Sequence, residues 1–207
     1  MMREGMRVGI ADHLGWAVAV TASEDHEVMD RRRIELVEPG ISAAPIHYES
    51  RRLDVARTAA LVAEVRASVV RATSAALDEL ASSGAVVSIS LRTWPLDFPD
   101  DVAVQRRAPY EARADAIMYR QELSELAYAR GWEVHVYDRK AVVGQARGML
   151  AERADAVLDG PRAALGPPWT MDHRVALAAT VVASGQSSAA RRKRSPSARS
   201  SAASSGG

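Results

Sequence analysis

A lone carboxylate, Asp12, ends an apolar run near the start of the sequence and is the first candidate for chemistry. Val8, Ile10 and Asp12 alternate with period two, so a strand there places the carboxylate in the row of core-facing side chains, at the strand's open end. An acid in that position is costly unless it is paired or bound to a metal ion. Asp12 is therefore either a metal ligand or a hydrogen-bonded structural acid, and the sequence leaves both open.

A second acid lies at the start of the last apolar stretch, 170–183. Thr170 is a good N-cap for a helix over this stretch, which places Asp172 and His173 in the first turn. Negative charge is favoured at a helix N-terminus, so capping alone could explain Asp172. In that interpretation His173 is a surface or packed histidine. The alternative is that Asp172 and His173 are catalytic residues and that Asp172 binds a metal.

The least generic stretch is 92–101, which contains three carboxylates, an arginine and two aromatic residues and is stiffened by two prolines. A loop at the exit of a parallel strand is where open α/β sheets bind ligands. A proline-pinned surface loop, with Trp94 and Phe98 packed as plugs, explains the same residues without a ligand. The candidate binding residues in and after this loop are Arg92, Trp94, Asp97, Asp100, Tyr110 and Arg113.

Strands and helices that could position these residues follow from hydrophobic periodicity. A hairpin over 7–20 is followed by a third extended stretch, and apolar residues then recur every three or four positions from Asp54 to Gly84. The remaining predicted elements are a buried strand over 85–91, a helix over 109–130, a strand over 132–137, a single helical stripe through Val142, Ala146, Met149, Arg153 and Val157, a rigid loop over 159–169, and the final helix. Strand alternating with helix is the pattern of a crossover sheet.

Composition limits the classes of function. At 207 residues with 47% hydrophobic residues, the chain predicts one domain, 1–186, followed by a Ser/Ala/Arg-rich tail, 187–207, that we expect to be disordered. It has no cysteine, so a metal here must use oxygen or imidazole ligands. We find no run of eighteen apolar residues and no leader pattern, and we therefore expect a cytoplasmic protein without a membrane partner.

Charge is distributed unevenly. The tail holds five basic residues and no acid, so the remainder carries 22 basic and 26 acidic residues, a net charge of −4. Nucleic-acid binding by the domain would therefore need a local basic patch. Alternation over 31–33 places Arg31 and Arg33 on one face of a strand and Arg32 on the other, which favours a solvated strand over a phosphate site.

The order of these elements resembles the ribonuclease H-like fold, a mixed five-stranded sheet flanked by helices. Within that fold, residues 6–183 are most similar to bacterial Holliday-junction resolvases, and an actinobacterial family that would add no activity is a further suspected assignment. The likeness lies in order and spacing. It is carried by Gly9-Ile10-Ala11-Asp12 to Gly15-Trp16-Ala17-Val18, by Ala114-Asp115-Ala116 to Gly131-Trp132-Glu133-Val134, and by Asp172-His173-Arg174-Val175-Ala176-Leu177-Ala178-Ala179.

The resemblance implies a metal site. Such enzymes hold two magnesium ions about 4 Å apart between carboxylates, so Mg or Mn is the implied cofactor and Asp12 and Asp172 the implied ligands, with His173 beside them. The resemblance also implies a glutamate at the end of the strand over 88–92, where this chain has none. Either Asp97 or Asp100 substitutes from the loop, or the metal site is lost.

Two functions remain. The first is a catalytically silent or degenerate ribonuclease H-like module that binds a partner, with nucleic acid as one possibility. The second is a divalent-metal-dependent nuclease acting on structured nucleic acid. The incomplete acid set and the acidic domain favour the first. The sequence contains no P-loop, no Gly-x-Gly-x-x-Gly and no Gly-x-Ser-x-Gly motif, so the common nucleotide-binding and hydrolase signatures are absent.

Overall fold

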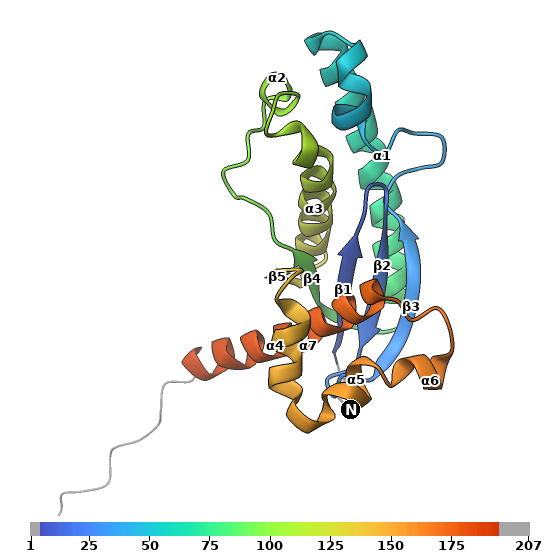
Figure 1. The fold of residues 1–207 in the computed structure, drawn as a ribbon, viewed down its shortest axis with the longest axis vertical. Coiled ribbons are helices and arrows are strands. Elements are labelled where there is room, and N and C mark those ends of the chain that lie inside the picture. Colours follow the sequence, from blue (N-terminus) through green and yellow to red (C-terminus); the bar gives the residue numbers. More distant parts are fainter. Residues whose placement is uncertain (1–4, 195–207) are drawn as a thin grey trace, which may run out of the picture.

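The computed structural model describes residues 5–194 and contains a five-stranded sheet in the order β3-β2-β1-β4-β5 (Figure 1). The first three strands pair antiparallel, and β1, β4 and β5 pair parallel. The strands are β1 (Met6–Asp12), β2 (Trp16–Ala22), β3 (Val28–Glu35), β4 (Val86–Arg92) and β5 (Glu133–Tyr137). This is the mixed five-stranded sheet that the sequence predicts.

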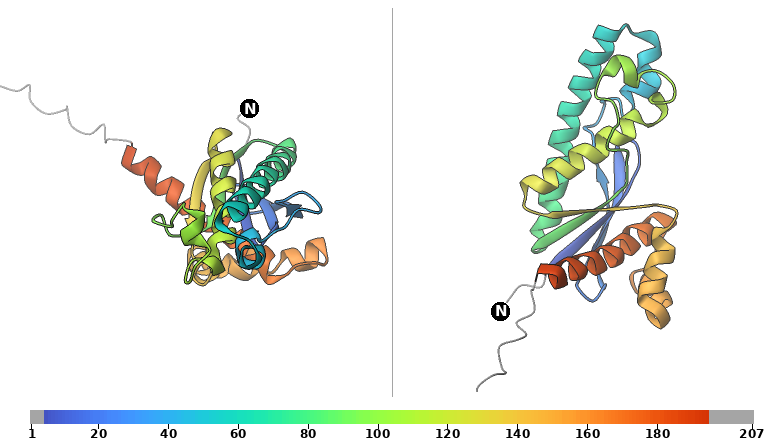
Figure 2. Two further views of the ribbon diagram at one scale, coloured as in Figure 1. Left: turned by 90° about the horizontal axis from the view of Figure 1, so that it is seen from above. Right: turned by 90° about the vertical axis from the view of Figure 1, so that its left-hand side faces the viewer.

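Helices cover both faces of the sheet (Figures 1 and 2). Val8 and Ile10 of β1 pack in one cluster with side chains of α1 (Val55–Ser82) and α3 (Glu111–Ala129). Ala11 packs in a second cluster with side chains of α4 (Val142–Leu150) and α7 (Met171–Arg194). Alternate side chains of β1 therefore face different helical layers, which decides the environment of Asp12 and of the residue after it.

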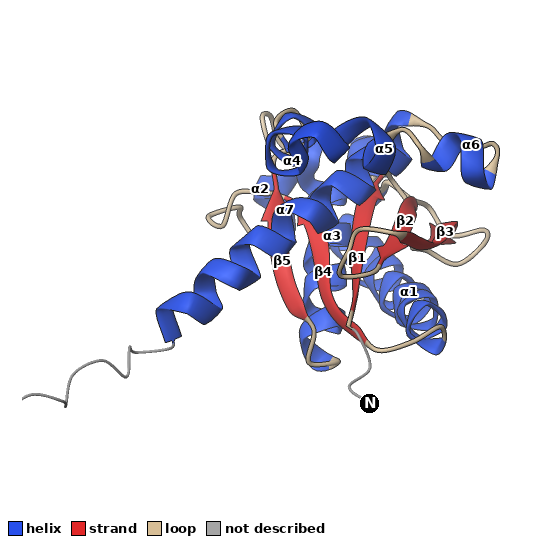
Figure 3. Ribbon diagram, turned by 90° about the horizontal axis from the view of Figure 1, so that it is seen from below, coloured by secondary structure: helices blue, strands red, loops and turns tan. Residues whose placement is uncertain are grey.

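The long helix α7 lies directly on β1 because Gly9 has no side chain. A Cβ atom at Gly9 would lie 1.9 Å from the backbone carbonyl oxygen of Ala176. Figure 3 shows α7 crossing the strands, with α4, α5 (Ala154–Leu158) and α6 (Pro161–Leu165) beyond its N-terminal half. No helix in the described part of the chain is long and apolar enough to cross a membrane.

One predicted helix differs from the structure. The single helix predicted through 142–157 is wrong, because Ala151 adopts a left-handed conformation (φ 51°) that separates α4 from a 3₁₀ turn (Ala151–Arg153) and α5. Helix α7 ends at Arg194, and the division into a domain over 1–186 and a tail over 187–207 stays a prediction. The remainder of the predicted tail, 195–207, lies outside the described residues.

The short elements lie around the loops. A π-helical turn (Pro45–Glu49) and a 3₁₀ turn (Ser50–Arg52) precede α1, and α2 (Val102–Gln105) lies between β4 and α3. Asp115 of α3 accepts hydrogen bonds from the backbone N–H groups of Ile46 (3.1 Å) and His47 (2.9 Å). The buried carboxylate of Asp115 thus satisfies the start of the π-helical turn, and burial raises its pKa.

Candidate functional site at the end of β1

Asp12 is buried at the end of β1, and its partner is an arginine from α3. Alternation places Asp12 on the face of Val8 and Ile10, which is the face that α3 covers. Both Nε and Nη2 of Arg120 lie 2.8 Å from Oδ2 of Asp12. The side chains of Arg120 and Asp12 are only 9% and 3% exposed. Of the two sequence interpretations of Asp12, the geometry is that of a paired structural acid.

The next residue, His13, turns toward the opposite layer. Its Nε2 lies 2.9 Å from Oδ2 of Asp172, in the first turn of α7. Arg139, which follows β5, donates from Nη2 to the other oxygen of Asp172 at 2.9 Å. Burial raises the pKa of Asp172, but the hydrogen bonds from His13 and Arg139 outweigh it and hold that pKa below its usual value. Asp172 is therefore a carboxylate with a cation on one oxygen and a histidine on the other.

The end of β4 supplies no acid to this edge of the sheet. Ser90 is buried and donates to the carbonyl oxygen of Ala179 in α7, and Leu91 belongs to the core cluster between the sheet and α1. The strand ends at the half-buried Arg92. The glutamate that the resemblance implies is thus replaced by a buried apolar residue and a guanidinium.

Tyr137, at the end of β5, connects these groups. Its hydroxyl donates to the carbonyl oxygen of Ile10 at 2.6 Å. Burial, followed by the charge of Asp12, raises the pKa of Tyr137, and the guanidinium groups of three arginines act against that rise. Those arginines are Arg139, Arg120 and Arg92. The edge therefore holds three guanidinium groups and the carboxylates of Asp12 and Asp172.

A stack of rings extends this edge toward β3. The rings of His13 and Trp16 lie parallel, with centroids 4.1 Å apart and an interplanar angle of 9°. The guanidinium of Arg33 lies 4.2 Å from the centroid of the Trp16 ring. Between His13 and Trp16 the chain reverses through Gly15, whose φ of 81° and near contact with Ala43 leave no room for a side chain.

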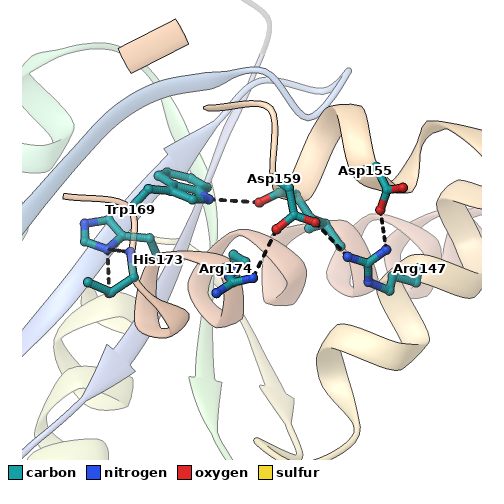
Figure 4. A network of polar contacts seen from close by, with 8 residues as sticks. Arg147, Asp155, Asp159, Trp169, His173 and Arg174 are labelled. Atoms are coloured by element: carbon teal, nitrogen blue, oxygen red, sulfur yellow. Dashed lines mark hydrogen bonds and ion pairs between the residues drawn. The ribbon is translucent and has the colours of Figure 1, made fainter. Parts of the chain in front are cut away.

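His173 contacts the residues just before α7 rather than Asp12. Its Nδ1 lies 2.9 Å from the hydroxyl of Thr170, and its ring lies beside that of Trp169 (Figure 4). Burial lowers the pKa of His173, and the charge of Arg31 lowers it further. The contacts of His173 are those of a packed histidine that closes the N-terminus of α7.

The loop before α7 is fixed by the first arginine of the 31–33 run. The two Nη atoms of Arg31 contact four consecutive carbonyl oxygens, those of residues 165–168, at 2.6 to 3.4 Å. Arg32 reaches Glu79 of α1 on the opposite face of β3, as the alternation predicts. Figure 4 shows a further network behind the loop, in which Asp159 joins Arg147 of α4 to Arg174 of α7.

The loop after β4 divides its candidate residues between core and solvent. Phe98 is buried, the ring of Tyr110 meets it edge-on at 5.6 Å, and Trp94 packs against the same cluster. Asp97 and Asp100 are exposed, as is Arg113 at the start of α3. Trp94 and Phe98 are thus the packed plugs of the alternative interpretation, which leaves Asp97, Asp100 and Arg113 as surface groups.

The donor set does not fit a magnesium or manganese centre. In the part of the chain that the structure describes, no three His, Asp or Glu side chains come together in a way that could hold a metal ion. Asp12 is already neutralised by the buried guanidinium of Arg120, and a divalent cation beside that guanidinium would be repelled. The two acids also have separate partners. Asp12 pairs with Arg120 of α3, whereas Asp172 of α7 contacts His13 and Arg139.

Of the three arginines at this site, sequence reasoning singled out Arg92 alone. It did not single out Arg120, Arg139 or Tyr137. A signal for Arg120 was present, because position 120 lies on the same helical stripe as Ala116 and Leu123, and an arginine in an apolar stripe requires a buried partner. Arg139 lies in a polar turn after β5 and carries no comparable signal.

The strand order and the mixed pairing define the class of protein: the chain has the ribonuclease H-like fold. No family model and no curated protein sequence matches it. Among solved structures, the chain is similar to Thermus thermophilus RuvC in complex with a Holliday junction substrate, with 12% identity and a TM-score of 0.48 over 89% of this chain and 96% of that chain. A second T. thermophilus RuvC structure has 11% identity and a TM-score of 0.47 over the same shares.

Proposed function

We propose that this protein is a catalytically silent ribonuclease H-like module in which a buried ion pair stands where the metal centre of the related enzymes would be. The observation that carries the proposal is the contact of Arg120 with Asp12, with both nitrogens at 2.8 Å and both side chains almost fully buried. A guanidinium in that position supplies the positive charge that a metal ion would otherwise supply. It leaves the carboxylate without a free oxygen pair for coordination.

The ligand of the module is an anion rather than a cation. Three guanidinium groups face two carboxylates at this edge, and Arg92 and Arg139 are partly open to solvent. Arg113 adds an exposed positive charge at the start of α3, after the loop that begins at Arg92. The phosphodiester backbone of nucleic acid is an anion that such a patch binds without a metal. We infer that the module binds structured nucleic acid through this patch and does not cleave it.

The alternative is a metal-dependent nuclease, and one observation favours it. The 2.9 Å contact of His13 with Asp172 places the N-terminus of α7 at the end of β1, as the metal site would require. In that case Arg120 would have to release Asp12 when a cation or a substrate binds.

Thermal unfolding with and without manganese separates the two functions. A metal at 100 times its dissociation constant stabilises a folded protein by about 2.7 kcal/mol, which is a shift of roughly 5–10 °C for a chain of this size. The silent module shows no shift and no cleavage of four-way junctions or RNA–DNA hybrids. A shift in the wild type that Asp12→Asn abolishes, and that the surface variant Glu64→Gln on α1 retains, would establish the nuclease alternative.

Binding is measured separately, by fluorescence anisotropy of labelled four-way junction DNA in the presence of EDTA. We expect affinity to fall steeply with salt, and to fall about tenfold in the double variant Arg92→Gln/Arg139→Gln. The exposed Arg57 on α1 provides the control variant Arg57→Gln, which should bind as the wild type does. Equal binding by all three proteins would remove the patch as the interface.

A further inference from the structure

A cavity lies at the opposite end of the strands from Asp12. Because β2 runs antiparallel to β1, the turn after β2 (residues 23–27) lies at the edge where β1 begins. This turn, the start of β3 and the segment from Arg153 to Leu165 line an open cavity of about 540 Å³. Small-molecule sites commonly have volumes of about 300–1,000 Å³ and combine apolar walls with a few polar groups.

His26 occupies the turn and is half-buried. Its φ of 71° is in the left-handed region, where histidine, asparagine and aspartate are found more often than other residues with a side chain. Ser23 fixes the turn by accepting backbone hydrogen bonds from His26 and Glu27. The Nδ1 atom of His26 is buried and has no hydrogen-bond partner among the described residues. Because Nδ1 is closed to solvent, a molecule in the cavity meets the imidazole through the part of the ring that lines the cavity.

Positive groups surround that imidazole. Arg153 lines the cavity and donates to the carbonyl oxygen of Asp25 at 3.3 Å. Arg7 of β1 has a buried Nη1 atom that also has no hydrogen-bond partner in the described chain. Burial lowers the pKa of His26, and the charges of Arg7 and Arg153 lower it further, against the charge of Asp25, which raises it. Of the positive groups, Arg153 lines the cavity beside His26, and a guanidinium next to an imidazole N–H donor favours a carboxylate.

The rim of the cavity requires a positive group on the ligand. Asp25 and Glu27 are exposed and line the cavity, and they would repel a ligand whose only charge is a carboxylate. The walls are apolar, formed by Val28, Val157 and the 46% exposed Leu165. Arg31 donates to the carbonyl groups of residues 165–168 and so holds the end of α6, which forms one wall, in place.

We propose that this cavity binds an apolar α-amino acid, with its carboxylate at His26 and Arg153, its ammonium group at Asp25 and Glu27, and its side chain against the apolar walls. Each of the three parts of such a ligand meets one of the three kinds of group that line the cavity. A ligand of nine non-hydrogen atoms in a partly open cavity binds with a dissociation constant on the order of 0.1–1 mM.

The test is an NMR titration of the full chain with L-leucine, followed at the imidazole resonances of His26. Three probes each remove one part of the ligand: 4-methylpentanoate lacks the ammonium group, 3-methylbutylamine lacks the carboxylate, and glycine lacks the side chain. We expect leucine to saturate and each probe to bind at least about tenfold more weakly. Equal binding of 4-methylpentanoate, or no shift with leucine at about 10 mM, would overturn the proposal.

Two variants and one control locate the binding. His26→Asn keeps a residue that tolerates the left-handed conformation and removes the imidazole. Ala164→Phe fills the apolar part of the cavity from an exposed position, where folding is not at risk. Both should abolish the saturable leucine shift of neighbouring backbone amides. Arg162→Gln, on the same helix α6 but outside the cavity lining, should leave it unchanged; loss in this variant, or retention in both of the others, would place the binding elsewhere.

Discussion

Removing one partner of the Asp12–Arg120 pair should be among the most destabilising single changes in this protein. Arg120→Met keeps the length and the apolar stem of the side chain on α3 but leaves a carboxylate that is 3% exposed without its counter-charge. Breaking a buried ion pair in this way costs about 3–5 kcal/mol. For a chain of this size that corresponds to a fall in Tm of roughly 6–20 °C. Asp12→Asn should cost a similar amount, because it leaves the guanidinium unpaired.

The double variant makes this expectation specific to the pair. In Asp12→Leu/Arg120→Met both charges are replaced by apolar groups of similar volume, which is often neutral and in some proteins stabilising. The coupling energy from urea unfolding of the wild type, both single variants (Arg120→Met and Asp12→Leu) and the double variant should therefore be several kcal/mol. If Arg120→Met unfolds as the wild type does, the pair is not formed in solution, and the proposal that Arg120 takes the place of a metal ion at Asp12 fails with it.

Three further predictions concern other parts of the fold. Gly9→Ala should destabilise by about 1–3 kcal/mol in thermal or urea unfolding, because the new Cβ meets the backbone carbonyl of Ala176 and α7 must move off β1; an unchanged Tm would show that α7 does not lie this close. Arg31→Met should speed limited proteolysis in the loop before α7 by releasing four carbonyl groups, with no change of cleavage as the contrary outcome. Stability should fall as pH decreases below 6.5, because the pKa values of both His26 and His173 are lowered from that ordinary value in the folded state and protonation favours unfolding; a double replacement of these histidines by Asn that leaves the slope of ΔG against pH unchanged would refute this assignment.

Local sequence pattern was enough to predict the sheet, the buried acid at the end of its first strand and the start of the last helix. The alternation of Val8, Ile10 and Asp12 predicted a strand with a core-facing acid at its end, and Asp12 is buried there. Helix-capping chemistry predicted a helix beginning near Asp172, and α7 begins at Met171. Both predictions depend only on neighbours within a few residues in the chain, and such short-range regularities are the ones that a sequence displays directly.

The identity of each partner could not be predicted in the same way. Asp12 and Arg120 are 108 positions apart, and His13 and Asp172 are 159 apart, so nothing local records that they meet. The break at Ala151 was missed for a related reason. The stripe through Val142, Ala146 and Val157 is compatible with one helix, and the chain departs from it at a residue whose type does not favour the left-handed region. Periodicity describes the face a residue prefers and contains no information on what covers that face.

The choice between a metal centre and an ion pair follows from how the residues around Asp12 support one another. On the face of Asp12, β4 offers Leu91, which packs in the core and excludes water from this end of the sheet. In a region of low polarity an isolated carboxylate is strongly destabilised, and one nearby cation is required. A metal centre would require further carboxylates around the same ion, and an apolar β4 cannot provide them. Arg120 requires one carboxylate only, which Asp12 supplies. The apolar residue on β4 and the arginine on α3 are therefore mutually consistent: one guanidinium is enough for Asp12 because β4 places no second carboxylate beside it.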